Sequence, residues 1–213
     1  SLSSDSVFAI LEDQAGMLWL GTRGGGLNRF DPATGVFSHY RHDPADPTSL
    51  GNDNVFALLE DDDGALWVGT DGGLDRFDPA TGIFTHTRND PDDPASLSSD
   101  TVRALFVDSS GDLWVGTWGG GLDHFDRMTG TFTHYRNDPD NPASLSNDAV
   151  FSIQQDGTGA LWIGTLGGGL NRLDLQTGAF RRFGSDDSDP SGFGASQIFR
   201  MLSDGTTMWF ATG

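Results

Sequence analysis

The side chains that could carry acid–base or metal chemistry recur at regular intervals along this sequence. His39, His86 and His134 occupy one repeated position, near the end of successive copies of a longer segment. A catalytic or metal-binding site needs different groups that converge on one point, whereas these are one residue type on an expected outer strand. No carboxylate pair and no Ser-His-Asp set stands out among the many turn aspartates. We therefore expect periodic surface histidines, no catalytic residues and no enzyme.

Binding residues are expected where the copies differ. The position after a repeated Gly-Thr pair holds four different residues: Arg23, Asp71, Trp118 and Leu166. The glycines that follow let a ligand approach the backbone closely, and changing side chains on a constant scaffold are typical of a binding surface. Trp118 fits this role best because an exposed indole can stack on a sugar ring. A partly buried ring that caps a neighbouring copy is the alternative.

Arg103 is a second anomaly among the copies. The other copies carry phenylalanine at this position: Phe8, Phe56, Phe151 and Phe199. A charge within an otherwise apolar strand is unusual unless it is paired. We expect Arg103 either to contact a ligand or to form a buried pair with an aspartate.

A polar residue and an aspartate stand together near the start of each copy. These pairs are Ser4-Asp5, Asn52-Asp53, Ser99-Asp100 and Asn147-Asp148. Calcium takes about six to eight oxygen ligands, so the four aspartates are its candidate ligands here. The alternative is that they accept backbone N–H bonds in their loops. The Gly-Gly-Gly runs lack the helix and the Lys-Ser/Thr of a phosphate loop, so we expect no cofactor apart from this calcium candidate.

These residues are positioned by a repeat whose period is set by five tryptophans. Trp19, Trp67, Trp114, Trp162 and Trp209 are 48, 47, 48 and 47 residues apart. Self-similarity at such a period indicates a repeat architecture. The predicted repeats are 1–48, 49–95, 96–143 and 144–190, with a partial fifth over 191–213.

One repeat predicts four short strands. In the second copy they span residues 54–60, 65–70, 74–78 and 83–88, with Asp- and Gly-containing turns at 61–64 and 79–82. Four antiparallel strands per copy are typical of a β-propeller blade. The sequence therefore predicts an all-β propeller of about 47–48 residues per blade, with four full blades and the first two strands of a fifth. The tryptophans are expected to pack one blade on the next.

Composition limits the partners. The net charge of −19 and the pI near 4.2 disfavour nucleic acid and anionic lipid. There is no cysteine, and no apolar run approaches the roughly 18 residues that span a bilayer. We expect no direct membrane insertion in this segment. The sequence opens directly on a repeat and stops inside one, so we interpret it as part of a longer protein or an isolated domain whose targeting signals lie elsewhere.

The motif L-W-[VLI]-G-T-x-G-G-G-L-x-R-F-D, followed by T-G-x-F, resembles the two-component-regulator propeller repeat. It runs here from Leu18 to Asp31, with close versions around the next three tryptophans. The resemblance implies a periplasmic or extracellular sensing region of a bacterial hybrid histidine kinase, in a family where many members respond to oligosaccharides. The related virginiamycin B lyase fold shows that propellers can be catalytic, but its catalytic residues have no counterpart that we can place.

We therefore expect a sensor propeller that recognises an oligosaccharide or another polar ligand on its loop face. The alternative is a structural or protein-interaction propeller that associates through blade edges and has no small ligand. The family's propellers have seven blades, and the shorter count here would expose two apolar blade faces. Copies of the chain could cover those faces by forming a homo-oligomer.

Overall fold

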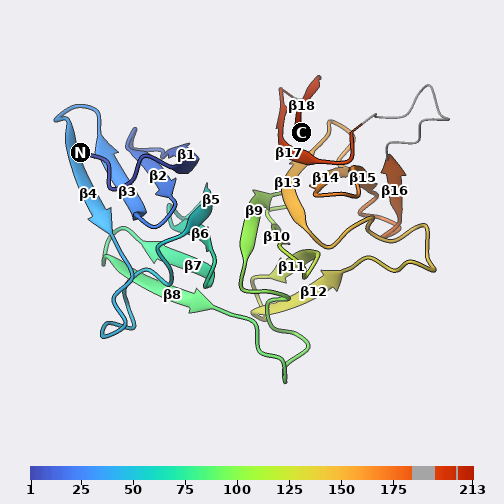
Figure 1. Ribbon diagram of the computed structural model, residues 1–213, viewed down its shortest axis with the longest axis horizontal. Helices are drawn as coiled ribbons and strands as arrows, with labels where there is room; N and C mark the ends of the chain where they lie inside the picture. Colours follow the sequence, from blue (N-terminus) through green and yellow to red (C-terminus); the bar gives the residue numbers. More distant parts are fainter. Residues whose placement is uncertain (184–194, 205) are drawn as a thin grey trace. The chain divides into compact units, whose positions relative to one another are not determined.

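The computed structural model describes residues 1–183, 195–204 and 206–213, and every regular element in them is a β-strand (Figure 1). The strands are β1 (Val7–Glu12), β2 (Leu18–Thr22), β3 (Gly26–Asp31), β4 (Val36–Tyr40), β5 (Val55–Glu60), β6 (Leu66–Thr70), β7 (Gly73–Asp78), β8 (Ile83–Thr87), β9 (Val102–Val107), β10 (Leu113–Thr117), β11 (Leu122–Asp126), β12 (Thr131–Tyr135), β13 (Val150–Gln155), β14 (Leu161–Thr165), β15 (Leu170–Leu173), β16 (Phe180–Phe183), β17 (Ile198–Ser203) and β18 (Met208–Thr212).

The strands form the predicted blades. Four sheets have four strands each, in the orders β1-β2-β3-β4, β5-β6-β7-β8, β9-β10-β11-β12 and β13-β14-β15-β16, and β17 pairs with β18. We call the four sheets blades 1 to 4. Neighbouring strands are antiparallel, as in the β5–β6 and β6–β7 pairs. The fold prediction is confirmed, and the strand ends of blade 2 agree with it to within one residue.

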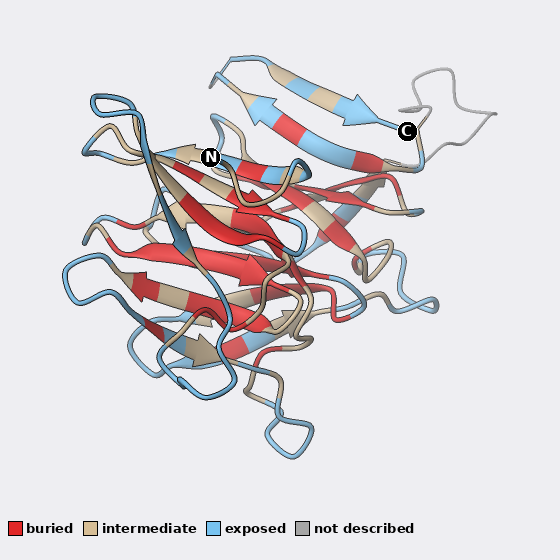
Figure 2. Cartoon of the chain, turned by 60° about the vertical axis from the view of Figure 1, so that its left-hand side comes forward, coloured by how far each residue is buried: buried red, intermediate tan, exposed pale blue. Residues whose placement is uncertain are grey.

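Each blade lies inside one predicted repeat. The predicted boundary between repeats 144–190 and 191–213 lies outside the described residues, as does Gly205 in the last turn. The chain divides into two compact units, Ser1–Leu105 and Phe106–Gly213, which are described separately below. Buried residues concentrate in the middle of the strands and exposed ones at the turns (Figure 2).

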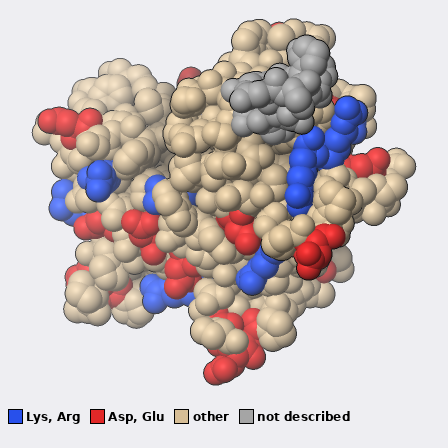
Figure 3. Space-filling model, turned by 45° about the vertical axis from the view of Figure 1, so that its right-hand side comes forward, with Lys and Arg blue, Asp and Glu red and all other residues tan. Residues whose placement is uncertain are grey.

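Much of the acidic charge belongs to turns. After the third strand of blade 2, Oδ1 of Asp78 accepts the N–H of Ala80 and Oδ2 accepts the hydroxyl of Thr81, both at 2.8 Å. The bonds from Thr81 and Ala80 lower the pKa of Asp78. Figure 3 shows Asp and Glu side chains in several separate groups on the visible face, with basic side chains between them. This distribution is the one expected when aspartate serves as a turn residue.

A second turn links an aspartate to the repeated tryptophan. In blade 2, Oδ1 of Asp61 accepts the N–H of Ala65 at 3.0 Å, and Oδ2 accepts the indole N–H of Trp67 at 3.1 Å. The same indole bond measures 2.8, 2.9 and 2.8 Å in Trp19–Asp13, Trp114–Asp108 and Trp162–Asp156. Partial burial raises the pKa of Asp156, but hydrogen bonds from Thr158 and its tryptophan outweigh it and hold that pKa well below its usual range.

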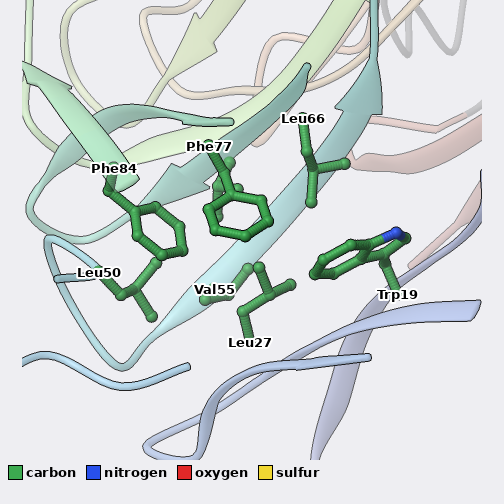
Figure 4. Packing of buried hydrophobic residues seen from close by; sticks show 8 residues of the cluster. Trp19, Leu27, Leu50, Val55, Leu66, Phe77 and Phe84 are labelled. Carbon is green, nitrogen blue, oxygen red and sulfur yellow. The ribbon is translucent and has the colours of Figure 1, made fainter. Parts of the chain in front are cut away.

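The core of the first unit lies between blades 1 and 2. Trp19 and Leu27 of blade 1 pack in one cluster with Leu66, Phe77 and Phe84 of blade 2 (Figure 4). Trp19 is 2% exposed, and its ring centre lies 5.5 Å from that of Phe77. The predicted role of the tryptophan in packing one blade on the next is confirmed for this pair.

In the second unit, the β17–β18 pair packs on blade 4. Leu170 of blade 4 clusters with Ile198 and Met201 of β17. Other side chains of the same pair are exposed: Leu202 is 64% exposed and Trp209 is 49% exposed. The fifth tryptophan is therefore half exposed, unlike Trp19.

A polar pair joins the third and fourth strands of the blades. Asp75 on β7 is buried, lies 2.7 Å from Nδ1 of His86 on β8, and accepts the N–H of Gly51 at 2.7 Å. Equivalent pairs of 2.7 Å are His39–Asn28 and His134–Asp123. The sequence places these histidines on the surface, but the side chain of His86 is only 19% exposed because a buried partner holds it. Burial raises the pKa of Asp75, and the bonds from His86 and Gly51 oppose that shift.

Candidate ligand-binding site

The variable loops lie beside the segments that enter the next blade. In the first unit, the N–H of Gly24 donates to Oδ1 of Asn54 at 2.9 Å, and that of Gly26 donates to the carbonyl of Asp53 at 2.9 Å. In the second unit, the N–H of Gly119 donates to the carbonyl of Asp148 at 2.9 Å. The two kinds of loop expected to form a binding surface are therefore adjacent within each unit.

The calcium candidates act as loop acceptors. Asp53 accepts the N–H of His42 at 2.8 Å, and the same bond recurs at 2.7 Å for Asp100 with Asn89 and at 2.6 Å for Asp148 with Asn137. Asp5 is exposed. Across residues 1–183, 195–204 and 206–213, no group of three or more His, Cys, Asp or Glu side chains could hold a metal ion. The observed geometry is that of the backbone-acceptor alternative.

Three sequence-predicted residues converge in the first unit. Nη2 of Arg103 lies 3.7 Å from Oδ1 of Asp71, and its guanidinium carbon lies 3.5 Å from the ring centre of Phe56. Burial lowers the pKa of Arg103, the charge of Asp71 opposes this shift, and nearby Arg23 adds to it. Phe8 extends the group, with its ring centre 5.3 Å from that of Phe56. The site thus combines two guanidinium groups, a carboxylate and an aromatic face.

Sequence reasoning missed Asn54. Its side chain donates to Oδ2 of Asp71 at 3.0 Å while accepting the N–H of Gly24 at 2.9 Å, so it connects the two loops. Its repeat position varies as much as the loop position does, being Ser6, Asn54, Thr101, Ala149 and Gln197 in successive copies. This variability in the sequence is the signal that could have identified Asn54 as a site residue.

The second unit presents an aromatic strip. Trp118 is 45% exposed, and its ring centre lies 5.3 Å from that of Phe151, which lies 5.9 Å from that of Phe199. Trp118 therefore rests on an aromatic neighbour and still exposes nearly half of its surface. Leu166 is half-buried, and its N–H donates to the carbonyl of Ala149, two residues before Phe151. The sequence alone indicates for Phe151 and Phe199 only that they hold the repeat position at which Arg103 stands in blade 3.

The arrangement suits binding by stacking and hydrogen bonding. Exposed aromatic faces take up planar or ring-shaped apolar surface, as Trp118 and Phe199 offer. Guanidinium and carboxylate groups at Arg23, Asp71 and Arg103 supply directional donors and acceptors. Within the first unit, the partly exposed ring of Phe8 lies near these charged groups, so this unit by itself offers both a ring face and polar partners to a ligand.

The blades define the class of protein as a β-propeller. The resemblance stated from the sequence is confirmed: the two-component regulator propeller family matches residues 1–24, 49–72, 96–119 and 144–167. Each match runs from the start of a repeat to the variable loop position. The chain therefore carries four repeats of this family.

Known proteins share the sequence locally and the fold broadly. The sequence is 51% identical to histidine kinase P4 of Formosa agariphila over 49 residues. These residues make up 23% of this chain and 3% of that protein. An extracellular domain from B. thetaiotaomicron, described as belonging to a hybrid two-component system, matches with a TM-score of 0.78 and 23% identity over 97% of this chain and 28% of that one. Virginiamycin B lyase from Staphylococcus aureus matches with a TM-score of 0.69 and 18% identity over 97% of this chain and 62% of that one.

The two structural likenesses, at these identities, show the fold alone. The chain spans 28% of the extracellular domain that it resembles, and the neighbours include an enzyme as well as a two-component protein. Among the described residues, no helix is both long and apolar enough to cross a membrane.

Proposed function

We propose that this chain is part of the ligand-binding sensor propeller of a bacterial two-component protein and acts outside the cytoplasm, in the periplasm or at the cell surface. The four family repeats and the local identity to a histidine kinase support this proposal. The likeness to an extracellular domain of a two-component protein agrees with it. The chain would bind its ligand without transforming it.

The ligand in this proposal is an oligosaccharide. The observation that carries it is the exposed indole of Trp118, which packs on Phe151 with ring centres 5.3 Å apart and stands at a position that differs in every full repeat. Sugar rings have one apolar face that stacks on aromatic rings and a rim of hydroxyls that bond to charged and amide groups. The overall charge of −19 favours a neutral sugar over a sulfated or phosphorylated one.

A glycan array probed with the intact chain tests this function. We expect binding to a chemically related group of neutral oligosaccharides, with weaker signals from their sulfated forms. No binding across the array would contradict an oligosaccharide sensor. Release of a shortened or unsaturated sugar during incubation would show an enzyme instead.

A second candidate function is association through blade faces, and two exposed faces favour it. Ile10 on β1 is 68% exposed, whereas the equivalent Ile153 and Met201 are 5% and 8% exposed. Leu202 and Trp209 on the β17–β18 pair are 64% and 49% exposed. In the first unit, the same types of residue pack one blade on the next. We propose that the β17–β18 face of one copy covers the β1 face of a second copy, in a head-to-tail contact.

Sedimentation velocity tests this association. We expect a concentration-dependent oligomer that Ile10→Asp or Leu202→Asp converts to monomer, because either charge would be buried in the contact. Val36→Asp is the matched control, since Val36 is 57% exposed at a different surface. A monomer at every concentration, or oligomers that both test variants leave intact, would contradict the proposed contact.

A further inference from the structure

One connecting loop in the second unit encloses an arginine. Nε of Arg182 on β16 donates to the carbonyl of Ser144 at 2.9 Å, and Nη2 donates to the carbonyls of Asn141 and Leu145 at 2.9 and 3.1 Å. Nη2 also donates to the Ser144 hydroxyl at 2.7 Å. Carbonyl oxygens only accept hydrogen bonds, so this loop forms a cradle for a group with several donors and a positive charge.

The first unit contains a loop of similar sequence that shares two internal bonds with this one. Residues 42–51 read HDPADPTSLG, where residues 137–146 read NDPDNPASLS. The Ser49 hydroxyl donates to the carbonyl of Asp43 at 3.1 Å, as the Ser144 hydroxyl does to that of Asp138 at 3.1 Å. The N–H of Ser49 donates to the carbonyl of Asp46 at 3.1 Å, and that of Ser144 to the carbonyl of Asn141 at 3.1 Å. The two loops therefore share these two bonds, although the Ser49 hydroxyl also donates to the carbonyl of Asp46 at 2.8 Å, where the equivalent carbonyl of Asn141 accepts from Arg182.

The side chain facing the loop differs between the two units. Arg182 stands opposite Asn171 in its sheet, and His86 stands opposite Asp75 at the equivalent place. Nε2 of His86 lies 3.0 Å from the carbonyl of Pro47, at one edge of the loop. Imidazole is shorter than the arginine side chain, so His86 reaches the edge of the cradle and not its centre.

A pocket of about 490 Å³ lies where the guanidinium would be. Its lining includes His86 and Arg88 from blade 2 and Asp43, Asp46 and Ser49 from the loop. The carboxylates of Asp43 and Asp46 add negative charge to the carbonyl pattern. The positive charge of Arg88 lies at the same pocket, and the histidine is already held by buried Asp75.

We propose that this pocket binds the guanidinium group of an external ligand, in the way that the equivalent loop of the second unit binds Arg182. The ligand class is an alkylguanidine, either a free arginine-like molecule or an arginine side chain of a protein. The basis is an occupied copy and an open copy of one loop within the same chain. This site is separate from the loop surface around Trp118 and does not depend on the proposed sugar ligand.

Backbone amide NMR of the intact chain with ethylguanidinium as the probe tests the proposal. We expect saturable shifts in residues 43–51 at millimolar probe, and no such shifts with neutral ethylurea, which has the same planar shape. His86→Arg should fill the cradle from within and weaken probe binding at least about tenfold. The dispersed spectrum of that variant would confirm that it is folded.

Arg182→Ala is the matched variant, which we expect to gain binding of the guanidinium probe in the second unit. It removes the resident guanidinium, so the probe should now shift residues 138–145 as well. The absence of saturable shifts at 43–51 in the unchanged chain would overturn the proposal, even if Arg182→Ala gained them. Binding that His86→Arg leaves undiminished would also overturn it.

Two further probes distinguish the source of the guanidinium. Tighter binding of free L-arginine than of N-acetyl-arginine amide would indicate a small-molecule ligand. The opposite order would indicate an arginine within a polypeptide. Shifts at 43–51 that grow with protein concentration in the absence of probe would identify a second copy of this chain as that polypeptide.

Discussion

Phe77→Ala is expected to lower the free energy of unfolding by about 3–5 kcal/mol, the usual cost of truncating a buried phenylalanine. The ring is 1% exposed, and its centre lies 5.5 Å from Trp19, 4.9 Å from Tyr40 and 4.5 Å from Phe84. Two of these neighbours belong to the preceding blade, so the cavity would open between blades. Chemical denaturation of the variant and the unchanged chain measures the effect.

Phe30→Ala is the matched control for this prediction. Phe30 occupies the same repeat position in blade 1 and contacts Phe37 at 4.6 Å, much as Phe77 contacts Phe84. Phe30 is only partly buried, because it lies on the face of blade 1 that carries exposed Ile10. Its loss should cost about 1–2 kcal/mol. Equal costs for the two variants would contradict packing between blades as the main source of stability.

Asp61→Ala is expected to cost about 3 kcal/mol, since it leaves several donors without their acceptor in a buried turn. Asp61 has a side chain 1% exposed and accepts from the backbone of Ala65 and the indole of Trp67. Arg76 lies 3.6 Å from the same carboxylate. The turn and the tryptophan are therefore held by one side chain, and both should loosen together in thermal and chemical unfolding.

A double-mutant cycle isolates the indole bond. Asp61→Asn keeps one oxygen for the backbone, but its amide donor faces the donor of Trp67, so we expect a loss of about 1–2 kcal/mol. Trp67→Phe removes the indole donor. Because both changes remove the same bond, their combination should cost about 1 kcal/mol less than the sum. Strict additivity would show that the bond contributes nothing beyond side-chain packing.

The fold could be predicted in detail because each local turn and strand pattern recurs along the chain. A single Asp-Gly turn or one apolar run is weak by itself, but the same turn before Trp19, Trp67, Trp114 and Trp162 indicates the same blade each time. The burial of Trp19 and the exposure of Trp209 were not distinguishable from the motif. Both depend on whether a neighbouring blade packs on that face, which is a property of position in the array and not of the local sequence.

The candidate site could be predicted only in part. Variability located Arg23, Asp71 and Trp118, and the replaced phenylalanine located Arg103. The contact of Trp118 with Phe151 of the following blade agrees with the alternative in which this ring caps a neighbouring copy, but the sequence did not identify Phe151 as its partner. Periodicity predicted the exposed position of His39 correctly, but His86 and His134 are partly buried against Asp75 and Asp123. The group of loop carbonyls around Arg182 could be recognised only by comparing the two loops in three dimensions.

We propose that the loop of Trp118 in the second unit binds the ligand and that the repeated residues of each blade are scaffold. Isothermal titration calorimetry of the oligosaccharide selected on the glycan array, against the unchanged chain, Trp118→Ala and Trp209→Ala, tests this most directly. The two tryptophans are similarly exposed, at 45% and 49%, but only Trp118 stands at the variable loop position. We expect Trp118→Ala to weaken binding at least about tenfold, as loss of an aromatic anchor does, and Trp209→Ala to leave it unchanged. Unchanged affinity in Trp118→Ala would contradict the proposed site.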